Sequence, residues 1–437
     1  MKANYKKKIP QTKRNSIIAI VALMTLVCWY YSVPSKIFNR NALSAKKYEE
    51  LEAILSQTLV SSINSDNAWP TSLQFAQSNY SINYTINTQL ELFLKDLLAS
   101  YLSSFTSVVI LDNNTGSILA ALDYNGKTKQ FGKNLTFTPS SPAASIFKII
   151  TAADAIEQNE TNSNDLYFYL GRATTLYKHQ LQDKLLKYQR PVSLQKAFAQ
   201  SNNVIFGKVA LQHSDAVNLY NTATKFGFNQ EIFNLVRLSP SYFPIALDEY
   251  NLAELASGLN TVTLLSPIHA AKIAMIIAND GTSKSLKLIN SLENSEETLH
   301  DEKLSHFPYQ QHTEETVISP NTAREIKKMM RETVQSGTAK IISRKLHKNI
   351  LDKLDIGGKT GQMTGGIPEG KRDWFISFVR PKNRPNELGI SIAVMIVNQE
   401  RWYIRSTQLT KDIIQYYYNN LFELKQSNNY YSYRPKK

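Results

Sequence analysis

The alternation of apolar and polar residues predicts two β-rich segments on either side of a helix-rich one. Near the N-terminal side, apolar runs at residues 107–112 and 117–122 enclose an Asn/Gly turn and predict a β-hairpin. A helix is expected just before this hairpin, with four leucines on one face: Leu90, Leu94, Leu97 and Leu98. The sheet pattern returns later in the chain, at residues 354–362, 374–380 and 389–398, and a closing helix is expected over about 405–424.

Between these segments, from about residue 159 to 281, strand patterns are absent and Tyr, Leu and Ala recur at helical spacing. Helices are predicted at residues 194–206, 216–226 and 268–278. Residues 282–316 are polar and are expected to form loops or an insertion, and a helix beginning at Pro320 should run to about residue 335. The fold class predicted is mixed α/β (α+β): an antiparallel sheet with helices on both faces plus an all-helical lobe, with a cleft between them.

The N-terminal region predicts a membrane anchor. A basic cluster is followed by an uncharged apolar run at residues 16–31 that ends in Trp29, Tyr30 and Tyr31. Its length suits a bilayer and its aromatic end suits the interface. A cleaved signal peptide is the alternative, but these bulky residues stand where a small-residue cleavage site would be expected. We expect a cytoplasmic tail at 1–14, a transmembrane helix at 15–33, a stalk at 34–82, the main domain outside the cytoplasm at 83–424 and a flexible tail at 425–437.

Composition excludes several classes of function. The formal net charge of +14 is concentrated at the two ends of the chain, so no nucleic-acid-binding face is indicated. Cys28 is the only cysteine and lies within the predicted span. The exported part therefore has no disulfide and no thiolate ligand. The seven histidines show no metal-ligand spacing, and no metal or organic cofactor is expected.

A first candidate for chemistry is the pair Ser145 and Lys148, at the start of a helix predicted near Ala144. Three-residue spacing puts a hydroxyl and an amine on one helix face. A serine needs a neighbouring base to become a nucleophile, and a lysine serves as that base when its pKa is lowered. By itself this pattern is common, and a solvated helix start with a surface lysine would explain it as well.

Two further motifs are weak when taken singly. Ser201 and Asn203 offer a hydroxyl and a carboxamide inside the helix-rich segment, where a loop or helix cap is the simpler explanation. The run of residues 357–362 contains Lys359, Thr360, Gly361 and Gln362 at a predicted strand. Its glycines would allow a ligand backbone to approach closely. A glycine-containing strand with an exposed lysine is the alternative.

Together and in this order, S-x-x-K, S-x-N and K-T-G are the signature of penicillin-binding proteins and serine β-lactamases. The chain resembles the penicillin-binding transpeptidase domain, in particular its monofunctional, class B-like D,D-transpeptidases, over about residues 83–424. Further stretches resemble family landmarks: residues 85–87, 116–120, 266–271, 336–339 and 373–375. The resemblance implies a β-lactamase/transpeptidase-like fold behind the single transmembrane helix.

The resemblance also implies a mechanism. Ser145 would attack the penultimate D-Ala of a D-Ala-D-Ala stem peptide, with Lys148 as the base and Ser201 relaying a proton to the leaving nitrogen. Asn203 would bind the substrate amide and steady Lys148. An amine of a second stem peptide would then take the acyl group and form the cell-wall crosslink.

The strand motif would supply the rest of the substrate site. Lys359 would provide positive charge for the substrate carboxylate, Thr360 would hydrogen-bond it, and Gly361 would let the strand approach the ligand. The backbone N–H groups of Ser145 and Gln362 would form the oxyanion hole. Family members commonly carry Thr or Ser where this chain has Gln362, so a second hydroxyl for the carboxylate is missing.

Alternatives within the same chemistry are a D,D-carboxypeptidase and a β-lactamase. A non-catalytic penicillin-binding scaffold or sensor of the wall-synthesis machinery is the alternative of a different class. The expected partners are peptidoglycan stem peptides, β-lactams and, as a further candidate, a membrane glycosyltransferase of wall synthesis. The expected location is the bacterial plasma membrane, with a single pass, the N-terminus cytoplasmic and the catalytic domain periplasmic.

Overall fold

A computed structural model describes residues 46–66, 68–158, 161–182, 190–294, 314–384, 386–399 and 402–422. The chain divides into two compact units, residues 1–57 and 58–437. In the first unit, the described residues 46–57 are helical. Within the described ranges no helix is long and apolar enough to cross a membrane. The predicted tail at 1–14, the predicted span at 15–33 and the predicted tail at 425–437 lie outside those ranges.

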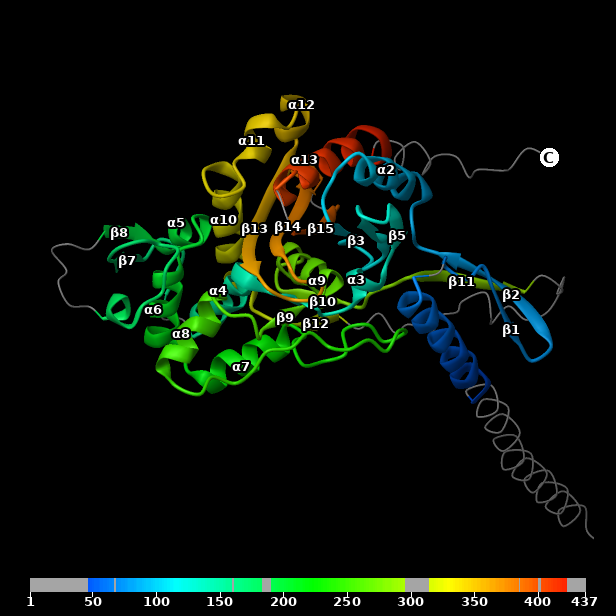
Figure 1. Cartoon of the computed structure of the whole chain (residues 1–437), viewed down its shortest axis with the longest axis horizontal. Coiled ribbons are helices and arrows are strands. Elements are labelled where there is room, and N and C mark those ends of the chain that lie inside the picture. The colour runs from blue at the N-terminus through cyan, green and yellow to red at the C-terminus, as the bar shows by residue number, and fades with distance from the viewer. Residues whose placement is uncertain are drawn as a thin grey trace, which may run out of the picture. The chain divides into compact units, whose positions relative to one another are not determined.

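The second unit is built on a six-stranded antiparallel sheet (Figure 1). Three of its strands come from the early part of the unit and three from the late part. The strand order is β13-β14-β15-β3-β4-β5. The bounds are β3 Phe105–Asp112, β4 Ile118–Asn125, β5 Gln130–Gly132, β13 Leu354–Thr364, β14 Lys371–Pro381 and β15 Ile390–Asn398. The central pairing is between β15 and β3, where Ile392 lies opposite Ile110. The hairpin and the three late strands predicted from the apolar pattern are thereby confirmed.

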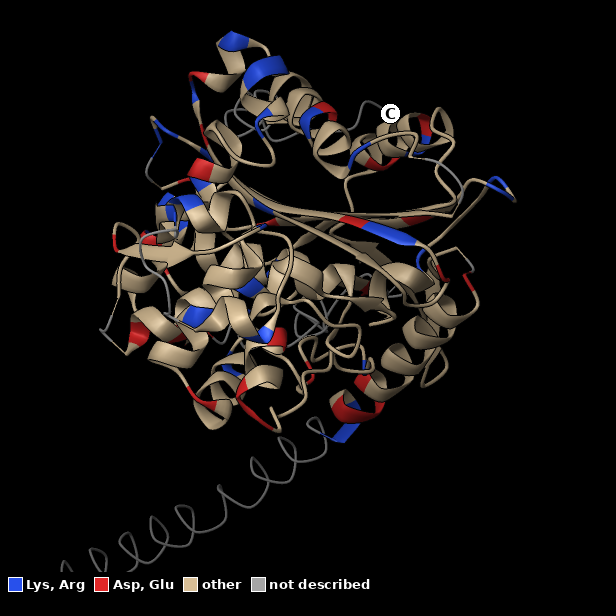
Figure 2. Cartoon of the chain, turned by 60° about the vertical axis from the view of Figure 1, so that its left-hand side comes forward, with Lys and Arg blue, Asp and Glu red and all other residues tan. Residues whose placement is uncertain are grey.

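Helices cover both faces of this sheet, as predicted (Figure 2). One face packs against α2 (Thr88–Ala99), α11 (Ile341–Lys345) and α13 (Ser406–Tyr416), which continues into a π-helical turn, Tyr417–Leu421. The other face packs against α9 (Pro267–Ala278), whose residues are almost all buried. α10 (Pro320–Gln335) packs against β13. Pro at the first position and a serine N-cap begin both α9 and α10.

The described part of the helix-rich segment contains α5 Leu194–Ala199, α6 Asn203–His213, α7 Ala216–Lys225 and α8 Glu249–Ser257 as well as α9, and α4 (Lys148–Glu157) lies just before it. The prediction that this lobe is all-helical is wrong. β7 (Leu166–Tyr169) pairs antiparallel with β8 (Arg190–Ser193), and β9 (Leu264–Leu265) pairs with β6 (Ser141–Pro142). In β7 the aromatic residues alternate between exposed and buried sides, and aromatic side chains favour strands as readily as helices.

The last part of the predicted stalk, from residue 72 to 82, forms strands. β1 (Ser72–Phe75) and β2 (Ser78–Tyr84) make a hairpin that pairs with β11 (Ile289–Asn294) in a three-stranded sheet. Polar residues dominate both segments, and only Tyr80 and Ile82 mark the buried side of β2. β10 (Thr282–Lys284) pairs antiparallel with β12 (Glu314–Thr316) in a separate two-stranded sheet. The remaining short elements are α3 Asn134–Phe137, α12 Lys348–Leu351 and the 3-10 turns Ala144–Phe147 and Lys178–Leu181.

Candidate active site

The three motifs, distant in sequence, meet where α4, the α5–α6 turn and β13 come together (Figure 1). Ser145 lies in the 3-10 turn Ala144–Phe147, and Lys148 is the first residue of α4. The loop before the turn is held by the Trp374 indole, which donates to the Pro142 carbonyl at 3.0 Å. Ser201 and Asn203 lie between α5 and α6, and the third motif occupies the interior of β13.

The Lys148 amine is fully buried at the centre of one hydrogen-bond network. Its Nζ lies 2.8 Å from Ser145 Oγ and 2.7 Å from Asn203 Oδ1, and it also contacts the Ser257 carbonyl. Burial lowers the pKa of Lys148 well below its ordinary value, and the positive charge of Lys359 lowers it further. Both effects favour the neutral form of the amine beside the serine, relative to an exposed lysine.

The Lys359 amine anchors a second network. It donates to Ser201 Oγ at 3.0 Å and to the Thr360 carbonyl at 2.8 Å, and the side chain is fully buried. Burial lowers the pKa of Lys359 to about 7. The Thr360 hydroxyl lies 2.6 Å from the hydroxyl of Thr338. This places the Thr338 hydroxyl beside a strand that carries a titratable cation and the Thr360 hydroxyl, an arrangement that suits an anionic group of a ligand.

The turn that carries Ser201 interrupts what the apolar pattern predicts as one helix. Ser201 has a left-handed backbone, φ 58°, which costs a non-glycine residue about 1–2 kcal/mol. Asn202 caps α6 by accepting from the Ile205 N–H at 3.1 Å. Asn203 is fixed by donating from Nδ2 to the Thr174 carbonyl at 2.9 Å. The capping residues thus orient Ser201 and Asn203 toward the two lysines.

Gly361 and Gln362 differ in their surroundings. Gly361 is buried against the Ser145 turn, and a Cβ there would lie 3.3 Å from the Ile146 nitrogen. Gln362 is exposed, and its Nε2 donates to Asp373 Oδ1 at 2.9 Å. Asp373 is buried and also accepts from the Ser406 N–H at 2.8 Å. The Gln362 side chain is therefore tied to Asp373 of β14, which in turn is bonded to the start of α13.

Three contacts at the site were not assigned from the sequence: the Ser257 carbonyl on Lys148, the Thr338 hydroxyl on Thr360 and the Asp373 carboxylate on Gln362. Gly258 is the sequence feature that could have indicated the contact between the Ser257 carbonyl and Lys148. Its φ is 68°, and a Cβ at this position would overlap the Ala144 carbonyl oxygen. A glycine is needed for the end of α8 to approach the Ser145 turn so closely.

The model of the penicillin-binding protein transpeptidase domain matches residues 106–415, more than half of the chain. The chain belongs to this family. Penicillin-binding protein PbpB of Mycolicibacterium smegmatis is 27% identical over 277 residues, which cover 58% of this chain and 40% of that protein. The chain therefore spans less than half the length of this curated relative.

Solved transpeptidase structures share the fold. Penicillin-binding protein 3 of Mycobacterium tuberculosis, complexed with aztreonam, has a TM-score of 0.61 at 18% identity, covering 82% of this chain and 81% of that one. The D,D-transpeptidase domain of a peptidoglycan glycosyltransferase from Eggerthella lenta has a TM-score of 0.58 at 20% identity, covering 78% and 84%. Membership of the penicillin-binding protein family supports a transpeptidase role in peptidoglycan synthesis.

Proposed function

We propose that this protein is a serine D,D-transpeptidase that crosslinks peptidoglycan through an acyl-enzyme on Ser145. The observation that carries the proposal is the buried amine of Lys148, which lies 2.8 Å from the Ser145 hydroxyl and has a lowered pKa. A base within hydrogen-bond reach of the nucleophile is the geometric requirement for covalent catalysis by a serine.

The contacts of Lys148 favour its action as the base. A neutral amine has two N–H bonds and one lone pair. Asn203 Oδ1 and the Ser257 carbonyl are acceptors only, so they take the two N–H bonds. The lone pair is then left for the hydroxyl of Ser145. This arrangement aligns the amine for proton removal before any substrate binds.

In the first half-reaction, the Ser145 oxygen forms a bond to the carbonyl carbon of the penultimate D-Ala while its proton passes to Lys148. The peptide C–N bond then breaks, and the terminal D-Ala leaves after its nitrogen receives a proton, through Ser201. The backbone N–H groups of Ser145 and Gln362 are proposed to stabilise the oxyanion, each worth about 3–4 kcal/mol. β13 is an edge strand that packs against the Ser145 turn, which supports this role for a backbone N–H on its free edge.

In the second half-reaction, the amine nitrogen of another stem peptide bonds to the ester carbonyl carbon, the C–O bond to Ser145 breaks, and the proton lost by the amine returns to the Ser145 oxygen through Lys148. Lys359, Thr360 and the neighbouring Thr338 are proposed to hold the terminal carboxylate of the donor peptide. Burial of Lys359 supports this role, because a cation near a ligand carboxylate interacts more strongly away from water. The same residues would hold the carboxylate of a penicillin, which we propose acylates Ser145.

We also propose that the protein is a single-pass protein of the bacterial plasma membrane, with its catalytic domain in the periplasm beside the wall. The support is the apolar run at residues 16–31 after a basic cluster. A membrane glycosyltransferase that supplies uncrosslinked glycan is the proposed partner. Fractionation of cells and protease access from the periplasmic side would test this placement.

The experiment that tests the reaction uses the full-length protein in detergent with uncrosslinked glycan strands that carry pentapeptide stems. Chromatography with mass spectrometry should show crosslinked dimers and released D-Ala. Ser145→Ala should form neither, whereas Ser140→Ala, on the same loop, should keep both. Tetrapeptide without dimer would instead identify a D,D-carboxypeptidase. Rapid turnover of penicillin would identify a β-lactamase, and the absence of any acyl product would identify a scaffold or sensor.

A further inference from the structure

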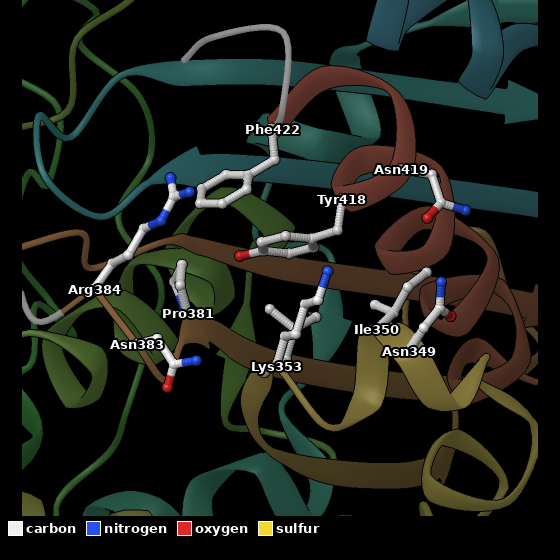
Figure 3. Close-up of a pocket in the computed structure, with 10 residues that line it drawn as sticks. Asn349, Ile350, Lys353, Pro381, Asn383, Arg384, Tyr418, Asn419 and Phe422 are labelled. Atoms are coloured by element: carbon white, nitrogen blue, oxygen red, sulfur yellow. The ribbon is translucent and has the colours of Figure 1, made fainter. Parts of the chain in front are cut away.

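A cavity of about 430 Å³ lies at the end of the main sheet (Figure 3). It is formed by α12, the beginning of β13, the end of β14 and the π-helical turn Tyr417–Leu421. Leu354 in its wall precedes Lys359 by five residues on the same strand, a separation of about 17 Å at about 3.4 Å per residue. The cavity is therefore separate from the cleft that holds Ser145, and its size is within the usual range for small-molecule sites.

The floor of the cavity is apolar and fixed. Ile350, Leu354 and Tyr418 are buried side chains. The Tyr418 hydroxyl donates to the Val379 carbonyl at 2.9 Å, which holds the ring in place. A π-helical turn is rare and is frequent at functional sites, and here it brings Tyr418 to the floor and Asn419 to the rim. The floor can therefore receive the apolar face of a ring.

The rim is polar and carries no carboxylate among the lining residues that the structure describes. Three carboxamides, each able to donate and to accept, come from Asn349, Asn383 and Asn419, and two cations come from Lys353 and Arg384. All five are exposed. In Figure 3 Asn349 and Asn419 lie on one side of the cavity, Asn383 and Arg384 on the other and Lys353 between them. Hydroxyl groups and an acidic group could be bound here together.

The charges around the cavity favour an anion. Lysines and arginines gather on the α11–α12 end of the domain (Figure 2). The cations in the segments next to the cavity are Arg344, Lys345, Lys348 and Lys382. Of the nearby acids, Asp352 is exposed and directly precedes Lys353, Asp355 is held by two bonds from Arg331, at 2.6 and 2.7 Å, and Glu387 lies 3.5 Å from Arg384 in an exposed pair. An exposed ion pair of this kind is weak and can give way to a ligand.

We propose that this cavity binds an acidic saccharide, a sugar that bears a carboxylate or phosphate group. Its ring would pack on Tyr418 and Ile350, its hydroxyl or acetamido groups would bond the carboxamides, and its acid would pair with Lys353 and Arg384. The Arg384 guanidinium is 5.4 Å from the centre of the Phe422 ring, which helps to hold it in place. A fatty acid would leave the carboxamides unused, and a neutral sugar would leave the cations unused. The inference does not depend on the reaction at Ser145.

Calorimetry on the full-length protein in detergent tests the proposal with three probes: the disaccharide of N-acetylglucosamine and N-acetylmuramic acid, the neutral disaccharide of N-acetylglucosamine, and inorganic phosphate. The acidic disaccharide should bind with a Kd below about 1 mM, and the neutral one at least about 10-fold more weakly, because a hydrogen bond to a charged group is lost. Lys353→Ala and Arg384→Ala should each weaken binding about 10-fold. Lys345→Ala, in a neighbouring segment outside the lining, is the matched control and should not. Penicillin labelling should stay normal in all three variants.

Four results would overturn the proposal. They are no heat of binding up to about 10 mM disaccharide, equal binding of the two disaccharides, equal binding of phosphate alone, and unchanged affinity in both cavity variants. Loss of binding after penicillin has acylated the protein would place the sugar in the catalytic cleft and would also count against it. Failure of penicillin labelling with intact sugar binding would contradict only the proposed reaction.

Discussion

Replacement of Asn203 by aspartate changes the charge beside the proposed base and keeps the shape of the side chain. Asn203 Oδ1 lies 2.7 Å from Lys148 Nζ. Unit charges at that distance attract by about 6 kcal/mol at an effective dielectric constant of about 20. The carboxylate would stabilise the ammonium form of Lys148 and oppose burial and Lys359, which lower its pKa in the native protein. We therefore expect the pKa of Lys148 to rise in Asn203→Asp.

The assay is the second-order rate of labelling by a fluorescent penicillin between about pH 6 and 10. Because the neutral amine is the reactive form, Asn203→Asp should label about 100-fold more slowly at pH 7, given the effect of a charge in contact. Its rate should recover as the pH rises, so that the acid limb of the profile lies at higher pH than in the native protein.

Asn203→Ala is the matched control. Both variants lose the donor to the Thr174 carbonyl, so both share that structural cost. Alanine adds no charge, and we expect labelling to slow by about 5–50-fold, as for loss of one or two buried hydrogen bonds, without movement of the acid limb to higher pH. If Asn203→Asp were labelled at the native rate at pH 7, with the same dependence of rate on pH, the argument that Lys148 must be neutral would be refuted.

Three further predictions concern stability and selectivity. Folded Lys359, with a pKa of about 7, binds its proton at lower pH than an unfolded lysine at 10.5, so the unfolded state binds more protons between these values and stability rises with pH. Lys359→Met should therefore raise Tm more at pH 7 than at pH 10 and should slow penicillin labelling; an equal Tm gain at both would contradict this. Gly258→Ala should cost more than about 2 kcal/mol of stability and should slow labelling, because the new Cβ would overlap the Ala144 carbonyl. The control is Gly171→Ala, whose new Cβ would meet only a side chain and which should cost about 1 kcal/mol. Gln362→Thr should speed labelling by carboxylate-bearing penicillins by about 5–10-fold through a new hydroxyl donor, and an unchanged rate would contradict this expectation.

The framework of the fold could be predicted from the sequence because its apolar residues are periodic. The strands of the main sheet and the helices α2, α9 and α10 have long buried faces, so the pattern shows them directly. β2 was missed because only Tyr80 and Ile82 face inward, and β7 was missed because its aromatic residues suit either structure. β2 is stabilised by pairing with β11, about 200 residues away, and the local pattern of apolar residues does not report this pairing.

The candidate site residues, which the structure brings together, could be proposed from the sequence, but their contacts could not. The spacing of Ser145 and Lys148 indicates a shared helix face, and the structure has a 3-10 turn that leads into α4 instead of one continuous helix. The Ser257 carbonyl bonds Lys148 through its backbone, which no side-chain motif reports. Likewise, the bond from Gln362 to Asp373 depends on the cross-strand register of β13 and β14, which sequence spacing does not determine.

The most direct test of the central claim is the site of acylation. Full-length protein treated with benzylpenicillin, digested and measured by mass spectrometry should carry the added penicillin mass on the peptide that contains Ser145, at that residue. Ser145→Ala should carry none, while Ser140→Ala should be labelled like the native protein. Acylation at any other residue, or persistent labelling of Ser145→Ala, would contradict the assignment of Ser145 as the nucleophile activated by Lys148.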